Sequence, residues 1–325
     1  MESTQNLKKR LKSIANIGKI TKAMELVAAT KMRRSQEIAL ASRPYAFVAL
    51  DLLSNLSLLE TELPELLKKK PSFAKASEGR TLYVLVASDK GLAGSFNSSV
   101  FRKFERFYRR PTSTSEASDV GRLHIHEDLF VAVGEKAFQY LSRKRHNVIQ
   151  KFVQVGDFTT PEQIQSLADF IIEGYLQKQY DKVIVFSTHF KSALKQEPLI
   201  REILPISFES IKETLKEIVP ETGRYSDIIT LPTPNTQHLT SDYLIEPSPK
   251  VVLEDLAKHL FFMQVYHLIL EANAAEHSAR RMAMKTASDN AAELSENLTL
   301  EYNKSRQAGI TNQIIEITAG AESLS

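Results

Sequence analysis

The stretch that comes closest to a binding or catalytic motif is Ser88–Ser95, with the sequence Ser-Asp-Lys-Gly-Leu-Ala-Gly-Ser. It follows an apolar, β-branched run and precedes a segment with helical periodicity, and phosphate-binding loops occur at such positions. The spacing of Gly91 and Gly94 fits neither a Walker loop nor a dinucleotide-binding fingerprint. We therefore interpret this stretch as a tight turn between a strand and a helix.

The other residues capable of chemistry are scattered along the chain. Asp89 and Asp128 lie near the ends of predicted strands, and neither has a second carboxylate or a base visibly paired with it. Among the histidines, His124 and His126 flank Ile125, and His267 and His277 lie on the predicted C-terminal helix. Two histidines alone do not make a metal site, and neither His267 nor His277 has a second histidine four residues further on. We predict no catalytic residue, no cofactor and no metal.

The composition is that of a globular protein of one large or two modest domains. The chain has 325 residues and a net charge of +3, which is too small to indicate nucleic acid by itself. It has no cysteine, so disulfides, thiolate metal sites and cysteine catalysis are excluded. No apolar run approaches the roughly 18 residues that span a bilayer, and the first residues lack the apolar core of a signal peptide. We expect the chain to stay in the compartment where it is made.

Residues 250–325 predict one long helix, because no proline follows Pro249 and no glycine occurs before Gly309. Such a helix is on the order of 100 Å long, so it cannot bury its face in one compact core and needs partners along its length. Its four-three seam consists of Leu256, Leu260, Met263, His267, Leu270, Ala274, His277, Arg281, Met284, Ser288 and Ala291. The first half of this seam is apolar and the second half is small or polar.

Residues 1–60 predict a second long helix, which Pro44 could kink. Apolar residues recur at intervals of three and four, as in a coiled coil. They are Leu7, Leu11, Ile14, Ile17, Ile20, Met24 and Val27, followed by Ile38, Ala41, Tyr45, Val48, Leu52 and Leu59. Ten Lys or Arg lie between Lys8 and Arg43, against only Glu25 and Glu37. This basic face meets either solvent, nucleic acid or an acidic protein surface.

Between the two helices the sequence changes character. Residues 61–80 read as a linker, 81–207 as an α/β domain with a Ser/Thr-rich loop at 111–119, and 208–249 as an irregular, proline-rich connector. The predicted strands are 81–88, 129–133, 148–153, 182–187 and 199–206, most of them separated by helical segments. This alternation predicts a mostly parallel sheet with helices on its faces.

The simplest architecture is a long antiparallel coiled coil of the N- and C-terminal helices, with an inserted Rossmann-like α/β domain. The C-terminal helix outlasts its partner by about a dozen residues, on the order of 20 Å. An unpaired helix end is marginal in water, yet this one is rich in apolar residues. They are Leu298, Leu300, Tyr302, Ile310, Ile314, Ile315 and Ile317. We expect another protein to cover them.

Three groups of motifs, in order along the whole chain, resemble the gamma subunit family of F-type ATP synthases, the central stalk of the rotary motor. The N-terminal group is Leu11–Ile14 and Lys19–Met32, and the middle group is Ser88–Asn97. The C-terminal group comprises Met284–Asn290, Leu298–Lys304, Arg306–Gln307, Ile310–Glu316 and Gly320–Ala321.

The resemblance implies a non-catalytic shaft without an active site of its own. The shaft would stand inside a hexamer of alternating alpha and beta subunits, with the α/β domain and the epsilon subunit seated on the membrane rotor ring of c subunits. Proton or sodium flow would turn it and drive ATP synthesis, on the cytoplasmic side of a bacterial inner membrane. The residues that the resemblance places against the hexamer are Met24, Lys31, Arg280, Arg306, Gln307, Thr311 and Glu316.

The chain departs from the family pattern at three places. Arg281 stands where an apolar residue is usual, Ser95 replaces a glycine, and 111–127 resembles an insertion. Without cysteine, the thiol switch of chloroplast relatives cannot operate. The residues alone leave two other functions open: a basic coiled coil that binds nucleic acid, and a nucleotide-binding enzyme built on the α/β domain.

Overall fold

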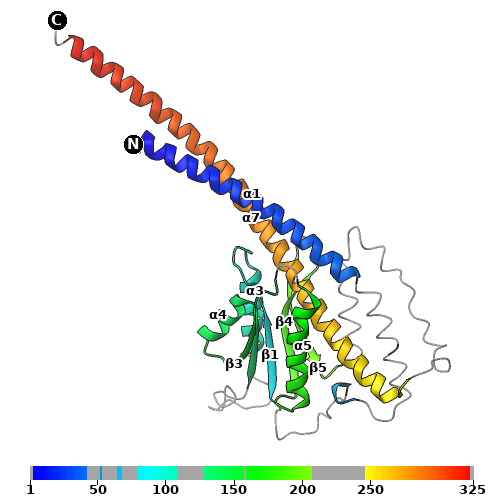
Figure 1. The fold of residues 1–325 in the computed structure, drawn as a ribbon. Helices are drawn as coiled ribbons and strands as arrows, with labels where there is room; N and C mark the ends of the chain where they lie inside the picture. Colours follow the sequence, from blue (N-terminus) through cyan, green and yellow to red (C-terminus); the bar gives the residue numbers. More distant parts are fainter. Residues whose placement is uncertain are drawn as a thin grey trace. The chain divides into compact units, whose positions relative to one another are not determined.

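A computed structural model of the chain divides into two compact units (Figure 1). Unit 1 comprises Met1–Ala29 and Arg280–Ser325, and unit 2 comprises Thr30–Ala279. The structure describes residues 3–41, 52, 64–67, 80–108, 128–156, 159–206 and 246–322. Two long helices, α1 (Thr4–Ala41) and α7 (Pro249–Glu322), each run through both units.

Unit 2 is built on one five-stranded sheet with the strand order β3-β2-β1-β4-β5. The strands are β1 (Thr81–Val86), β2 (Leu129–Val133), β3 (Val148–Phe152), β4 (Lys182–Phe190) and β5 (Gln196–Leu204). The first four are parallel, and β5 is antiparallel to β4. The turn between β4 and β5, residues 191–195, is too short for the crossover that a parallel neighbour requires. The predicted α/β class is therefore confirmed, as a mixed sheet.

Helices cover both faces of this sheet (Figure 1). Helix α5 (Pro161–Leu176) and the first half of α7 pack on one face, against Val84 and Val86 of β1. Helices α3 (Phe96–Tyr108) and α4 (Glu135–Arg143) pack on the other, against Leu85. Strands covered on both faces have nearly continuous apolar sequences, which explains the apolar sequence of Thr81–Val86. A 3₁₀ turn, η1 (Glu65–Leu67), adds Leu66 and Leu67 to the core.

Within unit 2, α7 is a core helix. Residues 263–278 are all buried. A helix that is buried all round belongs to the interior of a domain rather than to a surface. The apolar first half of the predicted seam therefore packs inside unit 2, where Leu260 and Leu270 belong to the main core cluster.

Unit 1 is a pair of antiparallel helices, formed by the start of α1 and the second half of α7. Gly18 lies against Ala291, since a β-carbon built on Gly18 would be 3.5 Å from that of Ala291. Buried or half-buried positions recur on α1 at Thr4, Leu7, Leu11, Ile14, Gly18, Thr21, Glu25 and Ala28. They recur on α7 at Met284, Ser288, Ala291, Ser295, Leu298, Tyr302 and Ser305. Both sets follow the heptad spacing of a coiled coil.

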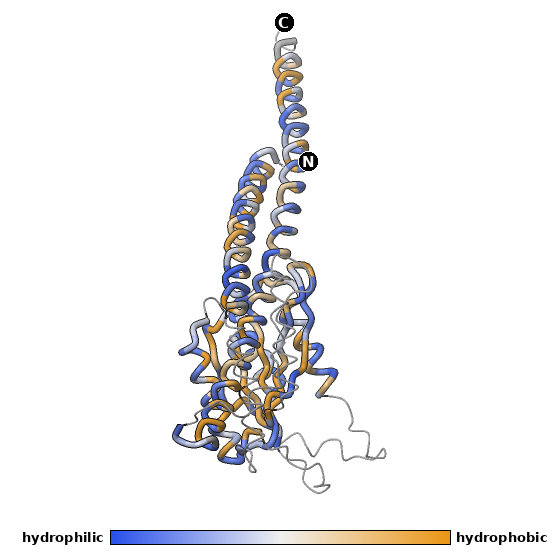
Figure 2. The backbone as a smooth tube through the Cα atoms, turned by 90° about the vertical axis from the view of Figure 1, so that its right-hand side faces the viewer, coloured by the Kyte–Doolittle hydropathy of each residue, from blue (hydrophilic) through white to orange (hydrophobic). Residues whose placement is uncertain are grey.

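Part of the predicted seam on the N-terminal helix is wrong. Ile17, Ile20 and Val27 are 49%, 59% and 54% exposed. The heptad that starts at Leu7 continues through small or polar residues such as Gly18. Which residues of α1 face α7 is therefore decided by their position in this repeat and not by whether they are apolar. Figure 2 shows hydrophilic and hydrophobic residues mixed along both helices of this unit.

Several expectations fall outside the described residues. These are the second apolar run beyond Ala41 apart from Leu52, the kink at Pro44, most of the linker 61–80, the loop 111–127 with His124 and His126, and nearly all of the connector 208–249.

The heptad phase predicts opposite outcomes for two apolar residues of α1. Leu7 is 1% exposed and Ile20 is 59% exposed. Leu7→Ala should lower the free energy of unfolding of the helix pair by about 2–3 kcal/mol, because it removes buried methyl groups. Ile20→Ala should change it by less than about 0.5 kcal/mol. Denaturant unfolding followed by helical circular dichroism measures both, and equal losses would contradict the phase observed in the structure.

Candidate functional site

The loop after β1 is closed by its own hydrogen bonds. The backbone N–H of Ser88 donates to Asn97 Oδ1 at 3.0 Å, and Asn97 Nδ2 donates to Ser88 Oγ at 2.7 Å. Ser88 Oγ donates to the carbonyl of Lys90 at 2.6 Å. Asp89 Oδ1 accepts the backbone N–H of Glu135 at 3.0 Å, at the first residue of α4. These bonds fix the loop to α3 and α4, as expected of a structural turn between a strand and a helix.

A second polar cluster lies buried where α7 crosses β4 and β5. Arg201 Nη1 is 2.9 Å from Glu271 Oε2, and His189 Nδ1 contacts Glu271 Oε1. Burial alone would raise the pKa of Glu271, but the charge of Arg201 and the hydrogen bond and charge of His189 outweigh burial and keep the pKa below its usual value. Glu271 is therefore a carboxylate that joins a helix to two strands.

The other side of α7 contacts the segment that follows β3. Asn273 Nδ2 donates to the carbonyl of Val155 at 2.9 Å and to Thr159 Oγ1 at 2.6 Å. His277 Nε2 lies 2.9 Å from the carbonyl oxygen of Gly156. His277, one of the two histidines on the predicted C-terminal seam, is thus used in packing and hydrogen bonding.

These polar residues do not form a catalytic or metal-binding constellation. Their hydrogen bonds and ion pair connect elements of unit 2 to one another, and no nucleophile is aligned with a base among them. Within the described ranges, no three His, Asp or Glu side chains come together in a way that could hold a metal ion.

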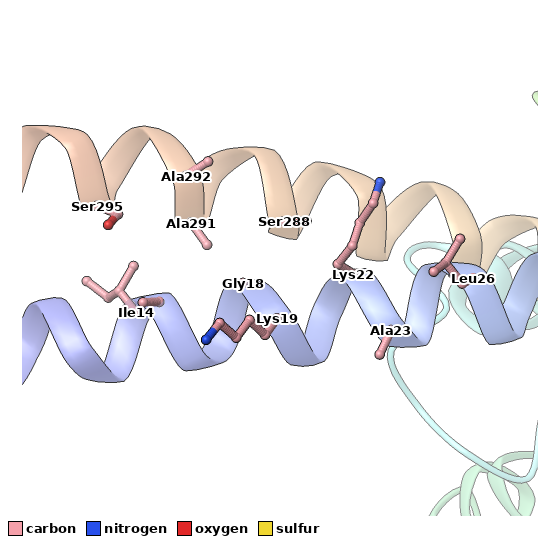
Figure 3. Close-up of a pocket in the computed structure, with 11 residues that line it drawn as sticks. Ile14, Gly18, Lys19, Lys22, Ala23, Leu26, Ser288, Ala291, Ala292 and Ser295 are labelled. Atoms are coloured by element: carbon pink, nitrogen blue, oxygen red, sulfur yellow. The ribbon is translucent and has the colours of Figure 1, made fainter.

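The helix pair of unit 1 has a different surface. A groove of about 570 Å³ runs along it (Figure 3). Small residues such as Gly18, Ala291 and Ser295 leave the groove open, and Lys19 and Lys22 line it. The ammonium of Lys22 also pairs with Glu25 at 2.9 Å. Such a surface, apolar at its base and basic around it, suits contact with an acidic protein.

The residues that the family resemblance places at a partner interface fall into two groups. Arg306, Gln307, Thr311 and Glu316 are exposed on α7 beyond the last buried position of the pair. The hydroxyl of Thr311 donates to the carbonyl of Gln307 at 3.0 Å. The remaining residues are half-buried: Met24 and Arg280 in unit 1, and Lys31 in unit 2.

Over residues 309–319, helix α7 has no buried side chain. Residues 309–319 are all exposed, and among them Ile310, Ile314, Ile315 and Ile317 are 49%, 56%, 57% and 72% exposed. Four exposed isoleucines within three helical turns form an apolar surface of the kind that marks a protein interaction site.

Comparisons with known proteins agree with this arrangement. A family model described as ATP synthase matches residues 3–324. The chain is 35% identical over 326 residues to the ATP synthase gamma chain of Roseiflexus castenholzii, covering 100% of this chain and 99% of that protein. It is 36% identical to the ATP synthase gamma chain of Opitutus terrae, covering 98% of each.

Solved structures share the fold. A chain of the Euglena gracilis mitochondrial ATP synthase, in a structure of OSCP, F1 and the c-ring, has a TM-score of 0.61 at 14% identity, covering 99% of this chain and 94% of that chain. A chain of the Tetrahymena thermophila central stalk and c-ring has a TM-score of 0.53 at 24% identity, covering 83% of this chain and 99% of that chain.

Among the residues that the structure describes, no helix is long and apolar enough to cross a membrane.

The buried carboxylate predicts a dependence of stability on pH. Glu271→Gln should lower the free energy of unfolding at neutral pH by about 3 kcal/mol, because it leaves Arg201 buried without its counter-charge. A group whose folded pKa is lowered stabilises above its unfolded pKa of about 4.3, and this stabilisation is lost as the pH falls through the folded pKa. The difference between the variant and the unmodified chain should therefore shrink in acid.

Urea unfolding between about pH 3 and pH 7 measures this difference. Glu197→Gln is the matched control, since Glu197 pairs with Lys191 at 2.9 Å but its side chain is 43% exposed. The control should cost less than about 1 kcal/mol. Equal losses for the two variants would contradict the assignment of Glu271 as a buried ionic link.

Proposed function

Because the chain belongs to the gamma-chain family of ATP synthases and is the central-stalk rotor of an F-type ATP synthase, we propose that its paired terminal helices turn inside a hexamer of alternating alpha and beta subunits. One observation carries this proposal. The end of α7, over residues 309–319, is exposed and rich in isoleucine, so it requires a protein lining that this chain does not supply.

The proposed contacts with the hexamer are made by both helices. Four exposed residues of the α7 end, Arg306, Gln307, Thr311 and Glu316, offer a cation, an amide, a hydroxyl and a carboxylate to the surrounding loops. Lower on the shaft, we propose the same role for Met24, Lys31 and Arg280. The basic surface of α1 supports an acidic lining, because opposite charge favours the correct partner over others.

We assign the foot of the rotor to the α/β domain within unit 2, residues 81–207. The chain is part of an ATP synthase complex, and the solved structures of similar fold are of assemblies that include the c-ring. By extension, unit 2 would rest on the ring of c subunits together with the epsilon subunit. Residues 1–60 and 250–325 would form the shaft, and 81–207 the foot, joined by 61–80 and 208–249.

The coupling ion would be a proton or sodium, and ATP synthesis would take place on the hexamer. The relatives are bacterial, so we place the complex at the inner membrane with this subunit peripheral on the cytoplasmic side. The two other functions considered for the sequence, nucleic-acid binding and nucleotide catalysis, gain no support from the bonded loop after β1.

The exposed end of α7 should depend on its partners for order. In the isolated subunit, amide hydrogens from Gly309 to Ala319 should exchange rapidly, because a single unpaired helix end is marginal in water. In the assembled complex the same amides should be protected. Hydrogen exchange with mass spectrometry measures both states, and strong protection in the isolated subunit would contradict a role for partner contacts.

Rotation is tested by two disulfides, which a chain without cysteine makes clean. The first, Gly18→Cys with Ala291→Cys, joins the two helices at a β-carbon distance of about 3.5 Å, within disulfide geometry. The second pairs Lys285→Cys, at an exposed position of α7, with a cysteine on the beta-subunit loop that it faces.

Oxidation should leave ATP-driven ion pumping intact in the first variant, because both helices turn together. In the second variant it should block pumping, and reduction should restore it. Lys285→Cys without the beta-subunit cysteine is the control for oxidation alone. If the second variant pumps normally while fully cross-linked, this part of the shaft does not rotate against the hexamer.

A further inference from the structure

Helix α7 is fixed by directional bonds shortly before it leaves unit 2. Earlier in the helix its contacts are apolar, through core residues such as Leu253, Leu260 and Phe261. Over its last two turns in this unit, from Glu271 to Ser278, hydrogen bonds and an ion pair are added to the apolar contacts of three alanines. The helix then continues without a break into unit 1 at Arg280.

One side of these two turns is bonded to the β4–β5 hairpin. Glu271 contacts His189 of β4 and Arg201 of β5, the latter at 2.9 Å. Two helical turns further along α7, Ser278 Oγ donates to the carbonyl of Ala193 at 2.7 Å and accepts from Gln196 Nε2 at 3.2 Å. Glu271 and Ser278 are 6% and 0% exposed, so water does not compete for these bonds.

The other side is bonded to the segment between β3 and α5. Asn273 Nδ2 donates to Val155 and Thr159, at 2.9 and 2.6 Å, and His277 Nε2 lies 2.9 Å from the carbonyl of Gly156. Asn273 and His277 are 6% and 1% exposed. A fourth bond on this side runs from the hydroxyl of Tyr266 to the carbonyl of Thr159, at 3.4 Å.

Helix geometry places the two sets on different sides of the helix. At roughly 100° per residue, positions 271 and 278 differ by about 20° around the axis, and positions 273 and 277 by about 40°. A member of one pair and a member of the other are separated by roughly 100° to 160° around the axis. We call these four residues, Glu271, Asn273, His277 and Ser278, the polar anchor.

An anchor on two different sides of a helix resists one motion in particular. Apolar contact is non-directional, so it opposes separation of a helix from a sheet more strongly than rotation of the helix about its own axis. Hydrogen bonds and ion pairs fix direction, and bonds on two different sides of an axis together oppose a turning moment. The exit of α7 from unit 2 is the place where a turning moment between foot and shaft would act.

We propose that the polar anchor transmits torque between unit 2 and α7, a role that rests on the proposed rotor function. Glu271 and Asn273 are its principal positioning residues. They act through the orientation of the helix and not through contact with nucleotide or ion. If these residues only stabilise the fold, a variant that keeps the stability of the complex also keeps the coupling of ATP hydrolysis to ion pumping. If they transmit torque, a variant that keeps the stability but lacks the directional bonds loses that coupling.

Two apolar variants achieve that separation. The first combines Glu271→Met, Arg201→Met and His189→Phe, since a buried ion pair replaced by apolar residues of similar volume often costs no stability. The second combines Asn273→Leu and Thr159→Val and removes both partners of one buried hydrogen bond, which can be nearly neutral. Leu260→Ala is the control, because it opens a cavity in the core around the same helix and leaves the polar anchor intact.

The experiment uses the whole complex in membrane vesicles and compares ATP-driven ion pumping with ATP hydrolysis in the same sample. Thermal melting of each complex gives its stability. Both apolar variants should retain hydrolysis and melting temperature but lose pumping per ATP hydrolysed, by at least threefold each. Leu260→Ala should melt at a lower temperature and keep the ratio of the unmodified complex.

An unchanged ratio in either assembled apolar variant would overturn the proposal, as would an equal loss in Leu260→Ala. If the triple variant does not assemble, the Asn273→Leu and Thr159→Val variant decides by the same criterion. The cross-link through Lys285→Cys distinguishes failure of the polar anchor proposal from failure of the rotor function. If only the polar anchor proposal is wrong, that cross-link still stops pumping. If the rotor function is wrong, it does not.

Discussion

A single continuous helix has to satisfy three different surroundings, and the rest of the structure follows from that constraint. Over residues 263–278, α7 is buried all round in unit 2. From Met284 to Ser305 it shares a seam with α1, and over residues 309–319 it is exposed on every side. Its composition changes accordingly from apolar, to small and polar, to isoleucine-rich. No one amphipathic pattern fits such a helix, because each segment meets a different partner.

The two units use opposite kinds of packing on that helix. Unit 2 buries large side chains and adds buried polar bonds, so α7 has one defined orientation there. Unit 1 brings two helices together through residues such as Gly18, Ser288 and Ala291, which allow close approach but bury little apolar area. The pair is therefore suited to being enclosed by other chains, and its exposed apolar residues lie outside the seam.

Much of this was predictable from sequence, and the reasons for the exceptions are physical. The two long helices and the alternating strands are predicted by local periodicity, and the order of motifs along the chain identifies the family. The seam of α1 was partly misplaced, since Ile17 and Ile20 repeat at the right interval but in the wrong phase. The antiparallel direction of β5 follows from the length of a turn and leaves no signal in the strand itself.

The polar cluster around Glu271 escaped prediction for a different reason. His189, Arg201 and Glu271 come from three elements far apart in the chain, and each is an ordinary surface-type residue in its own local pattern. Only the tertiary fold brings them together. The residues assigned to the partner interface, such as Arg306 and Thr311, rest on the family resemblance, because contacts with another chain leave no mark on a single chain's periodicity.

The small-residue seam of unit 1 also has a calorimetric consequence. The heat-capacity change on unfolding grows with the apolar area that becomes exposed, and the pairing of Gly18 with Ala291 hides very little of it. The helix pair should then have a flat stability curve, with weak dependence on temperature on either side of its maximum. Unit 2, with its large apolar core, supplies most of the curvature. Warming or cooling thus changes the stability of the core far more than that of the two helices that emerge from it.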